Sequence, residues 1–260
     1  MCYSSGSTLC KFIMIEVHAM DAIRIDRKQA KMVAHRGLSG IELENTCAAF
    51  VAAGNRDYWG IETDVHQTAD GKFVIFHDDV TGRVATQDIP VELSTFDHLR
   101  SLQLKEVRNH DAVRVDLHMP TPEEYFSICK RYNKVAVFEL KNPFDEARIE
   151  ELVAIAKKEI GLENVVFISF FFNNLVLVRK FAPNANCQFL TGKDFSDTTK
   201  AKLVEHKIDL DIYHLHVTPE LVAEMHEKGI LVNCWTVDDP DRAAALVEMG
   251  VDFITSNILY

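Results

Sequence analysis

The sequence predicts a closed (β/α)8 barrel of the TIM type, with a small inserted subdomain after the second strand. Eight apolar, β-branched runs alternate with helical segments along most of the 260-residue chain, which is typical of parallel βα units. The chain also has the length of a single barrel. An open doubly wound sheet is the alternative, but it usually carries a glycine-rich first turn of the GxGxxG type. The first turn here reads His-Arg-Gly-Leu-Ser-Gly, so the barrel is favoured.

The elements follow one another in a regular order. The eight expected barrel strands begin at Met32, Trp59, Val135, Val165, Cys187, Leu210, Ile230 and Asp252. An extra strand at 73–76 returns the chain after an Asp-Gly turn, which supplies positive φ easily. The expected helices lie at 45–54, 120–130, 145–159, 174–181, 196–206, 219–228 and 240–249. Several begin at proline and several end at glycine, as helix termini favour.

Two segments do not follow this alternation of strands and helices. Residues 1–30 are assigned to an N-terminal extension, and residues 31–260 to the barrel. Residues 82–119 contain Pro90, scattered charges and one short helical patch at 94–102. Long irregular segments in compact folds are usually functional or disordered. Because this one starts at the expected catalytic rim, we predict an inserted cap over the barrel mouth. A surface excursion without function is the alternative.

Composition and charge exclude several classes of protein. The net charge of −11 argues against nonspecific binding to nucleic acid or to anionic membranes. The six cysteines are scattered without a CxxC pair, which indicates a reducing compartment and no zinc or disulfide framework. No apolar run of about 18 residues is present to span a membrane, and no signal-peptide pattern is found. We expect a cytoplasmic protein without stable membrane insertion, and its oligomeric state is left open.

Polar residues gather where the expected strands end, the edge at which barrels place catalytic groups. Glu62 and Asp64 lie two residues apart in one strand, so both side chains project to the same face. Glu139 and Lys141 repeat this spacing. The other residues at this rim are His35, Arg36, His77 and Trp235. A solvated strand face or a surface histidine explains each alone, but their convergence favours a functional site.

These residue types predict phosphoryl chemistry. Three carboxylates without cysteine form a hard, oxygen-rich ligand set, which suits Mg²⁺ or Ca²⁺ and argues against zinc. Arg36 and Lys141 beside them suit an anion that bridges to the metal. Two histidines at such a site indicate one general base and one general acid. Together these parts describe in-line displacement at phosphorus.

Five segments resemble the glycerophosphodiester phosphodiesterase family. They are HRG at 35–37, ENT with a following Ala-Ala-Phe at 44–50, ETDVHQTADGKFVIFHDD at 62–79, FELK at 138–141 and VNCWTVDDPDRAAALVEMGVDFITSN at 232–257. They occur in order over most of the chain, from about Met32 to Asn257. The resemblance implies a barrel with a small insertion. It also implies metal-dependent hydrolysis of a small glycerophosphodiester to glycerol 3-phosphate and an alcohol.

The resemblance also implies a role for each site residue. The catalytic histidines are His35 and His77, and the ligands of a divalent cation, Mg²⁺ or Ca²⁺, are Glu62, Asp64 and Glu139. The residues that bind the phosphate are Arg36 and Lys141. Trp235 is an aromatic residue that lines the substrate pocket. The closing segment departs from the family's frequent T-D-x-P pattern and reads Thr-Ser-Asn-Ile at 255–258. This departure leaves the role of the last loop open. For His66, which shares the strand parity of Glu62, a place at the rim is weighed against a structural one.

Two other functions compete with this one. A phospholipase D-like phosphodiesterase, acting on lysophospholipid or sphingolipid headgroups, would use the same site. It should show an apolar, membrane-facing rim, and the acidic charge balance speaks against it. A catalytically silent binding barrel should lack at least one histidine or carboxylate of the site, and all five are present. The leaving alcohol, the preferred cation and the assignment of acid and base to the histidines are left open.

Overall fold

The computed structural model describes residues 21–106, 112–192 and 195–260, and within them the predicted (β/α)8 barrel is confirmed. Eight parallel strands follow the order β1-β11-β10-β9-β8-β7-β6-β2, and pairing of β1 with β2 closes the barrel. The strands are β1 (Lys31–Ala34), β2 (Gly60–Gln67), β6 (Val135–Leu140), β7 (Val165–Ser169), β8 (Asn186–Thr191), β9 (Asp209–Tyr213), β10 (Val232–Trp235) and β11 (Phe253–Ser256).

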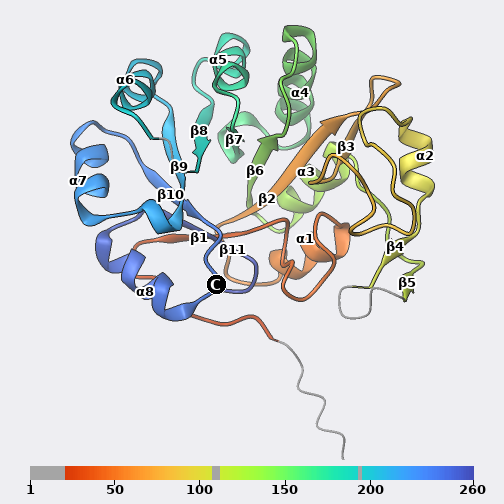
Figure 1. Ribbon diagram of the computed structural model, residues 1–260, viewed down its shortest axis with the longest axis horizontal. Helices are drawn as coiled ribbons and strands as arrows, with labels where there is room; N and C mark the ends of the chain where they lie inside the picture. Colours follow the sequence, from red (N-terminus) through yellow and green to blue (C-terminus); the bar gives the residue numbers. More distant parts are fainter. Residues whose placement is uncertain (1–20, 107–111, 193–194) are drawn as a thin grey trace, which may run out of the picture.

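Helices surround the barrel (Figure 1). They are α1 (Cys47–Gly54), α3 (Pro122–Arg131), α4 (Glu146–Glu159), α5 (Phe172–Phe181), α6 (Asp197–His206), α7 (Pro219–Glu227) and α8 (Pro240–Met249), with 3-10 turns η1 (Leu162–Asn164) and η2 (His214–His216). At α3, the Thr121 side chain accepts from the Glu124 N–H and Glu124 reaches back, forming a capping box. By contrast, α5 begins at Phe172, earlier than predicted, and no side chain caps it. No capping residue marks that start in the sequence.

Two apolar layers hold the barrel together. The larger lies between the strands and the surrounding helices, with Phe50, Tyr125 and Phe138 among its fully buried members. The smaller layer fills the barrel interior and consists of Val33, Val137, Val166, Ile168 and Leu190, with Trp59, Val135 and Trp235 packed against it. Because side chains of a strand alternate faces, Val137 and Glu139 share the inner face of β6. The interior layer therefore forms the floor under the polar strand ends.

The segment after the extra strand has a small core of its own. Strand β3 (Phe73–Ile75) pairs antiparallel with the end of β2, as the hairpin prediction requires. Residues 82–119 then contain α2 (Phe96–Ser101), β4 (Leu104–Lys105) and β5 (Val113–Arg114), and β4 pairs with β5. Their buried residues pack on Val74 and Phe76, and Figure 1 shows α2 and β4 beyond β3, to one side of the barrel. The action of this segment as a cap stays a prediction.

The predicted N-terminal extension lies partly outside the described residues, which begin at Asp21. The remainder runs along the C-terminal end of the chain. The Ile23 N–H donates to the Ile258 carbonyl and the Ile25 N–H to the Tyr260 carbonyl, both at 2.9 Å. In the part of the chain that the structure describes, no helix has the length and apolar character needed to cross a bilayer. The cytoplasmic location stays a prediction.

Candidate active site

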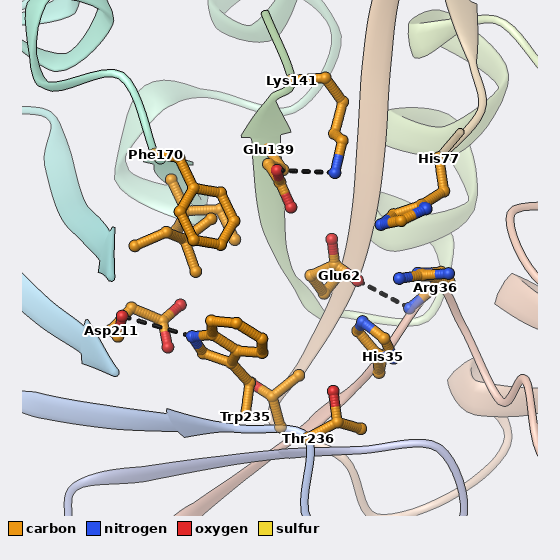
Figure 2. Close-up of a pocket in the computed structure, with 13 residues that line it drawn as sticks. His35, Arg36, Glu62, His77, Glu139, Lys141, Phe170, Asp211, Trp235 and Thr236 are labelled. Atoms are coloured by element: carbon orange, nitrogen blue, oxygen red, sulfur yellow. Dashed lines mark hydrogen bonds and ion pairs between the residues drawn. The ribbon is translucent and has the colours of Figure 1, made fainter. Parts of the chain in front are cut away.

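A pocket opens at the carboxyl ends of the barrel strands (Figure 2). It is lined by His35, Arg36, Glu62, His77, Glu139, Lys141, Ile168, Phe170, Leu190, Asp211, Trp235, Thr236 and Thr255. All the predicted site residues except Asp64 are among them, and Asp64 is fully buried beside Glu62 and Glu139. The structure therefore brings together the residues that the sequence singled out. None of the described residues of 82–119 lines this pocket.

Three carboxylates converge at the centre of the site. One oxygen each of Glu62, Asp64 and Glu139 lies within 4.8 Å of the others. The strand register explains this, because Asp64 of β2 is directly opposite Glu139 of β6, and Glu62 shares the inner face of β2. Glu62 Oε1, Asp64 Oδ1 and Glu139 Oε1 are all buried without a hydrogen-bond partner. Buried polar atoms normally find a partner, so this cluster could hold a metal ion.

The electrostatics of the cluster favour a cation. Burial and the charge of Asp64 raise the pKa of Glu62 well above its usual value and that of Glu139 to about 8. Burial acts in the same direction on Asp64, but Lys141 and Arg36 outweigh it and lower the pKa of that carboxyl. The Lys141 Nζ lies 3.0 Å from Glu139 Oε1 and 3.4 Å from Asp64 Oδ1. Both contacts are ion pairs whose geometry is not that of a hydrogen bond. Like charges 4–5 Å apart repel strongly in a buried site, so an additional positive charge would stabilise the ionised cluster.

The loop after β1 places Arg36 and shapes the cluster. The Arg36 N–H donates to Glu62 Oε2 at 2.7 Å, and its guanidinium donates to Glu44 at 2.8 Å. Arg36 has a φ of 53° and Gly37 a φ of 76°. A Cβ on Gly37 would come within 2.6 Å of the Ala49 backbone. The His-Arg-Gly sequence therefore needs its glycine both for the turn and for close contact with α1.

Asn45 fixes the orientation of Asp64. Its Nδ2 donates to Asp64 Oδ2 at 2.7 Å, and the Thr63 hydroxyl donates to Asn45 Oδ1 at 2.7 Å. All three side chains are buried. Asn45 has a φ of 54°, a conformation that asparagine tolerates better than most residues. The Glu-Asn-Thr segment of the sequence thus supplies a residue that holds a carboxylate of the cluster in place.

His35 is held by the last loop of the barrel. Its Nδ1–H donates to Asn257 Oδ1 at 2.7 Å, and the Asn257 amide donates to Asp238 Oδ2 at 2.6 Å. Asp238 fixes which way the amide points, and the amide oxygen fixes the imidazole tautomer, leaving Nε2 unprotonated. Burial lowers the pKa of His35 to about 4. The closing segment, whose role the sequence left open, thus orients this histidine through Asn257.

His77 is held by a carboxylate. Its Nδ1–H donates to Asp78 Oδ1 at 2.6 Å, and Arg83 donates to Asp78 Oδ2 at 2.7 Å. Arg83 also donates to both Glu44 oxygens, at 2.6 and 2.7 Å, and Glu44 in turn accepts from Arg36. Burial lowers the pKa of His77, and the charge of Asp64 opposes this shift. A guanidinium from the inserted segment therefore connects the partners of His77 and Arg36.

His66 does not line the pocket. It is fully buried, with Nε2 3.2 Å from the His77 carbonyl oxygen and Nδ1 3.2 Å from Glu92 Oε1. The sequence left open whether His66 lies at the rim of the site or has a structural role, and its buried contacts indicate the structural role. The sequence also predicts that four further histidines, His110, His118, His214 and His216, are surface or structural residues. Of these, His118 lies 2.8 Å from Arg100, and His214 accepts from Arg242. His110 lies outside the described residues.

The side of the pocket facing these charges is apolar and aromatic (Figure 2). We call it the aromatic wall; it consists of Ile168, Phe170, Leu190, Asp211 and Trp235. The ring centroids of Trp235 and Phe170 are 5.6 Å apart, edge to face. The Trp235 Nε1–H donates to the Asp211 carbonyl at 3.3 Å, which fixes the indole. The Asp211 side chain is itself buried, and burial raises its pKa well above the usual value.

Sequence reasoning missed several of these residues. Asp78 and Asn45 stand inside segments that the sequence singled out, so their positions beside His77 and Glu44 were available signals. Asn257 ends the last of these segments, whereas Arg83 and Asp211 carried no such signal. The contacts of all three join parts of the chain that only the closed barrel brings together, such as Asn257 with His35 across 222 positions.

Comparisons with known proteins agree with this geometry. Residues 35–258 match the family described as the glycerophosphoryl diester phosphodiesterase family. Protein YqiK of Bacillus subtilis is 30% identical over 226 residues, which cover 85% of this chain and 92% of that protein. The glycerophosphodiester phosphodiesterase of Caldanaerobacter subterraneus subsp. tengcongensis is 29% identical over 231 residues, covering 87% of this chain and 93% of that one.

A solved structure is similar as well. A phosphodiesterase from Oleispira antarctica, in complex with the product sn-glycerol-3-phosphate, superposes with a TM-score of 0.77 at 25% identity. The superposition covers 88% of this chain and 94% of that one. The family match extends over nearly the whole barrel and includes every residue of the charged pocket. The chain therefore belongs to the glycerophosphoryl diester phosphodiesterase family and is a phosphoric diester hydrolase.

Proposed function

We propose that this enzyme hydrolyses glycerophosphodiesters to glycerol 3-phosphate and an alcohol with the help of one divalent cation, Mg²⁺ or Ca²⁺. The observation that carries the proposal is the buried cluster of Glu62, Asp64 and Glu139, in which three oxygens lack hydrogen-bond partners. The relative from Oleispira antarctica binds sn-glycerol-3-phosphate, which supports this product for the present chain.

The donor set fits a hard cation. Glu62, Asp64 and Glu139 offer carboxylate oxygens alone, the ligands that Mg²⁺ and Ca²⁺ prefer. A cation bound by them would supply positive charge to the phosphoryl oxygens and lower the pKa of a bound water. The protein contributes the fixed positions of these oxygens, with Asn45 and the Arg36 N–H each holding one carboxylate by a hydrogen bond of 2.7 Å.

Arg36 and Lys141 bind the phosphate in this proposal. The Arg36 Nε is buried without a hydrogen-bond partner, so it has a donor to offer to an anion. The Lys141 Nζ lies beside the carboxylates and lines the pocket. Both cations would neutralise charge that builds up on the phosphoryl oxygens as the bond to the leaving alcohol breaks.

The two histidines differ in their partners, and this difference supports different roles for them. Asn257, which accepts from His35, is neutral, and burial keeps this imidazole uncharged with Nε2 free to accept a proton. His35 is therefore the general base for the attacking water. Asp78, which accepts from His77, is a carboxylate and stabilises the imidazolium form. His77 is therefore the general acid, which donates a proton to the leaving alcohol.

A phospholipase D-like activity on lysophospholipids is the second candidate. It is favoured by exposed apolar side chains directly after two strands at the pocket end of the barrel. Phe170 and Phe171 follow β7 with exposures of 42% and 39%, and Leu215 follows β9 with 62%. An acyl chain attached to the glycerol would find apolar surface there. This activity would need the same carboxylates and histidines.

One assay separates these functions. Release of glycerol 3-phosphate or lysophosphatidate is measured from water-soluble glycerophosphodiesters and from lysophosphatidylcholine, with Mg²⁺, with Ca²⁺ and with chelator. We expect turnover of the soluble diesters with a cation, and loss of turnover in chelator. Faster turnover of the lysolipid would favour the second candidate. Full activity in chelator would contradict the assignment of a metal to the carboxylate cluster.

A further inference from the structure

The buried His66 side chain contacts the backbone of a predicted catalytic residue. His66 lies on β2, two positions after Asp64, and its side chain is fully buried. Its Nε2 lies 3.2 Å from the His77 carbonyl oxygen. A carbonyl oxygen can only accept, so Nε2 carries a proton and donates it to this hydrogen bond. No backbone N–H of the described residues donates to the same carbonyl, so His66 supplies its hydrogen bond.

The His77 backbone depends on such a contact because it lies outside the regular strands. Strand β3 ends at Ile75, and residues 77–79 form a bend. Asp78 holds the His77 ring at Nδ1, but Asp78 is the next residue in the chain and moves with it. That bond therefore fixes the imidazole relative to its own segment. The contact from His66 fixes the segment relative to β2, the strand that carries two carboxylates of the cluster.

The ring of His66 is itself held by the inserted segment. Its Nδ1 lies 3.2 Å from Glu92 Oε1, and the Asn142 amide donates to the same oxygen at 2.8 Å. Glu92 belongs to residues 82–119, and Asn142 directly follows Lys141 in the loop after β6. Contacts at both ring nitrogens fix the orientation of His66. A continuous series of contacts thus runs from the inserted segment to the His77 backbone.

We propose that His66 is a positioning residue for His77, with its own ring held by Glu92 of the inserted segment. This inference rests on the proposed function, in which His77 is the general acid. The His77 proton must reach the oxygen of the leaving alcohol, and a misplacement of about 1 Å can lower a rate about 100-fold. His66 does not line the pocket. It acts through His77, by setting the distance between that imidazole and the carboxylate cluster.

The test compares His66→Leu with wild type on two substrates that differ in their need for an acid. One is the soluble alkyl glycerophosphodiester that wild type hydrolyses fastest, and the other is the p-nitrophenyl ester of glycerol 3-phosphate. An alkoxide needs a proton to leave, whereas p-nitrophenolate is stable without one at neutral pH.

We expect His66→Leu to lower kcat on the alkyl diester about 10- to 100-fold, with KM within about threefold of wild type. On the p-nitrophenyl ester, kcat should stay within about threefold of wild type, because that leaving group does not depend on the acid. Equal losses of kcat on the two substrates, or a loss confined to KM, would show a general disturbance of the pocket and overturn the inference.

Two further variants separate positioning from stability. His66→Gln keeps an amide that can donate to the His77 carbonyl, so it should restore most of kcat on the alkyl diester. Tyr125→Phe is the matched control, because it also removes a buried donor from a backbone carbonyl of β2, that of Ile61, but away from His77. It should keep kcat on both substrates within about twofold of wild type. A selective loss in Tyr125→Phe as large as that in His66→Leu would contradict the inference.

Glu92→Ala tests the same contacts without exchanging a buried residue, in case His66→Leu does not fold. The Glu92 side chain is 41% exposed, so its removal should leave the protein folded. We expect a loss of kcat that is again confined to the alkyl diester, of at least about threefold. Wild-type kcat of Glu92→Ala on both substrates would overturn the inference.

A crystal structure keeps the inference separate from the proposed function. It is determined for His66→Leu, or for Glu92→Ala if the first variant does not fold, and compared with a crystal structure of wild type. A shift of the His77 imidazole by about 1 Å or more relative to Glu62 and Asp64 supports positioning. That result holds even if His77→Ala loses activity equally on both substrates, so that His77 is not the general acid. An unmoved imidazole would overturn the inference, even if the proposed function is correct.

Discussion

The two sides of the pocket differ in how their acidic groups are satisfied. On the charged side, every carboxylate has at least one protein contact: Glu62 accepts from the Arg36 N–H, Asp64 from Asn45, and Glu139 pairs with Lys141. On the aromatic wall, the Asp211 Oδ1 has no hydrogen-bond partner among the residues that the structure describes. The charged side is organised by the protein before any ligand arrives, and preorganisation of this kind suits catalysis. The aromatic wall has no such arrangement of contacts, and burial raises the pKa of the Asp211 carboxyl well above its usual value, which favours the neutral form.

The largest effect on activity is expected when one carboxylate of the cluster is removed. Glu62→Gln keeps the shape of the side chain and its contact with the Arg36 N–H, but removes one of three charges that would hold the cation. We expect activity to fall below detection and cation binding by calorimetry to weaken. Because the carboxylate is buried beside two others, the variant should remain folded. Glu150→Gln, on the exposed face of α4, is the control, and it should behave as wild type.

Removal of either histidine should have the next largest effect. His35→Ala and His77→Ala should each lose on the order of 10²–10⁴-fold in kcat, the range for general acid-base catalysis. In wild type, kcat/KM against pH should be bell-shaped, and each substitution should remove one limb. Loss of the acid limb is expected in His35→Ala, because the base must be unprotonated to act. If the limbs were exchanged between the variants, the roles of the two histidines would be reversed.

Arg83 should have a smaller effect, because it acts through other residues. It contacts Asp78 and Glu44 and does not line the pocket. In Arg83→Ala, misplacement of His77 and Arg36 should lower kcat/KM by up to about 100-fold. Arg83→Lys keeps the charge but loses the forked contacts to both carboxylates, so it should restore only part of the activity. Full activity of Arg83→Ala would show that the link between the inserted segment and the site is incidental.

The Arg83 contacts also predict a pH dependence of stability. Burial alone would raise the pKa of Asp78, but hydrogen bonds from Arg83 and His77 lower it to about 2. A carboxyl with a depressed pKa stabilises the fold above its unfolded-state value, and this contribution is lost as the pH falls through the folded-state value. The difference in stability between wild type and Arg83→Ala should therefore be full at neutral pH and should shrink between about pH 4 and pH 2. Urea unfolding across this range measures it.

The smallest effect on activity is expected for a substitution of Tyr125, which lies in the apolar layer between the strands and the helices. The buried Tyr125 hydroxyl donates to the Ile61 carbonyl at 2.6 Å, next to Glu62 on the strand. Tyr125→Phe leaves that carbonyl without this donor, and the free energy of unfolding should fall by about 1–3 kcal/mol. Because no pocket residue loses a contact, kcat/KM should stay within about twofold of wild type. A large loss of kcat with normal stability would mean that the helix layer also positions the carboxylates.

The same contrast explains what could be predicted from the sequence. The charged side comes from residues two apart on single strands, such as Glu62 with Asp64, and from turns next to strand ends, such as His35 with Arg36. Strand alternation and barrel closure then bring these residues together. The interactions of Arg83 and Asn257 depend on side chains that meet across the fold, and no local pattern marks them. Asp211 stands in an apolar strand whose inward parity was predictable, but its lack of a partner was not.

The most direct measurement is the position of a bound cation in a crystal soaked with Mn²⁺, located from its anomalous scattering. A site organised by the protein on its charged side requires one ion coordinated by Glu62, Asp64 and Glu139. The same soak of Glu62→Gln should show a weaker signal or none. An ion bound elsewhere in the pocket, for example on Asp211, or no ion at a saturating concentration, would contradict the account.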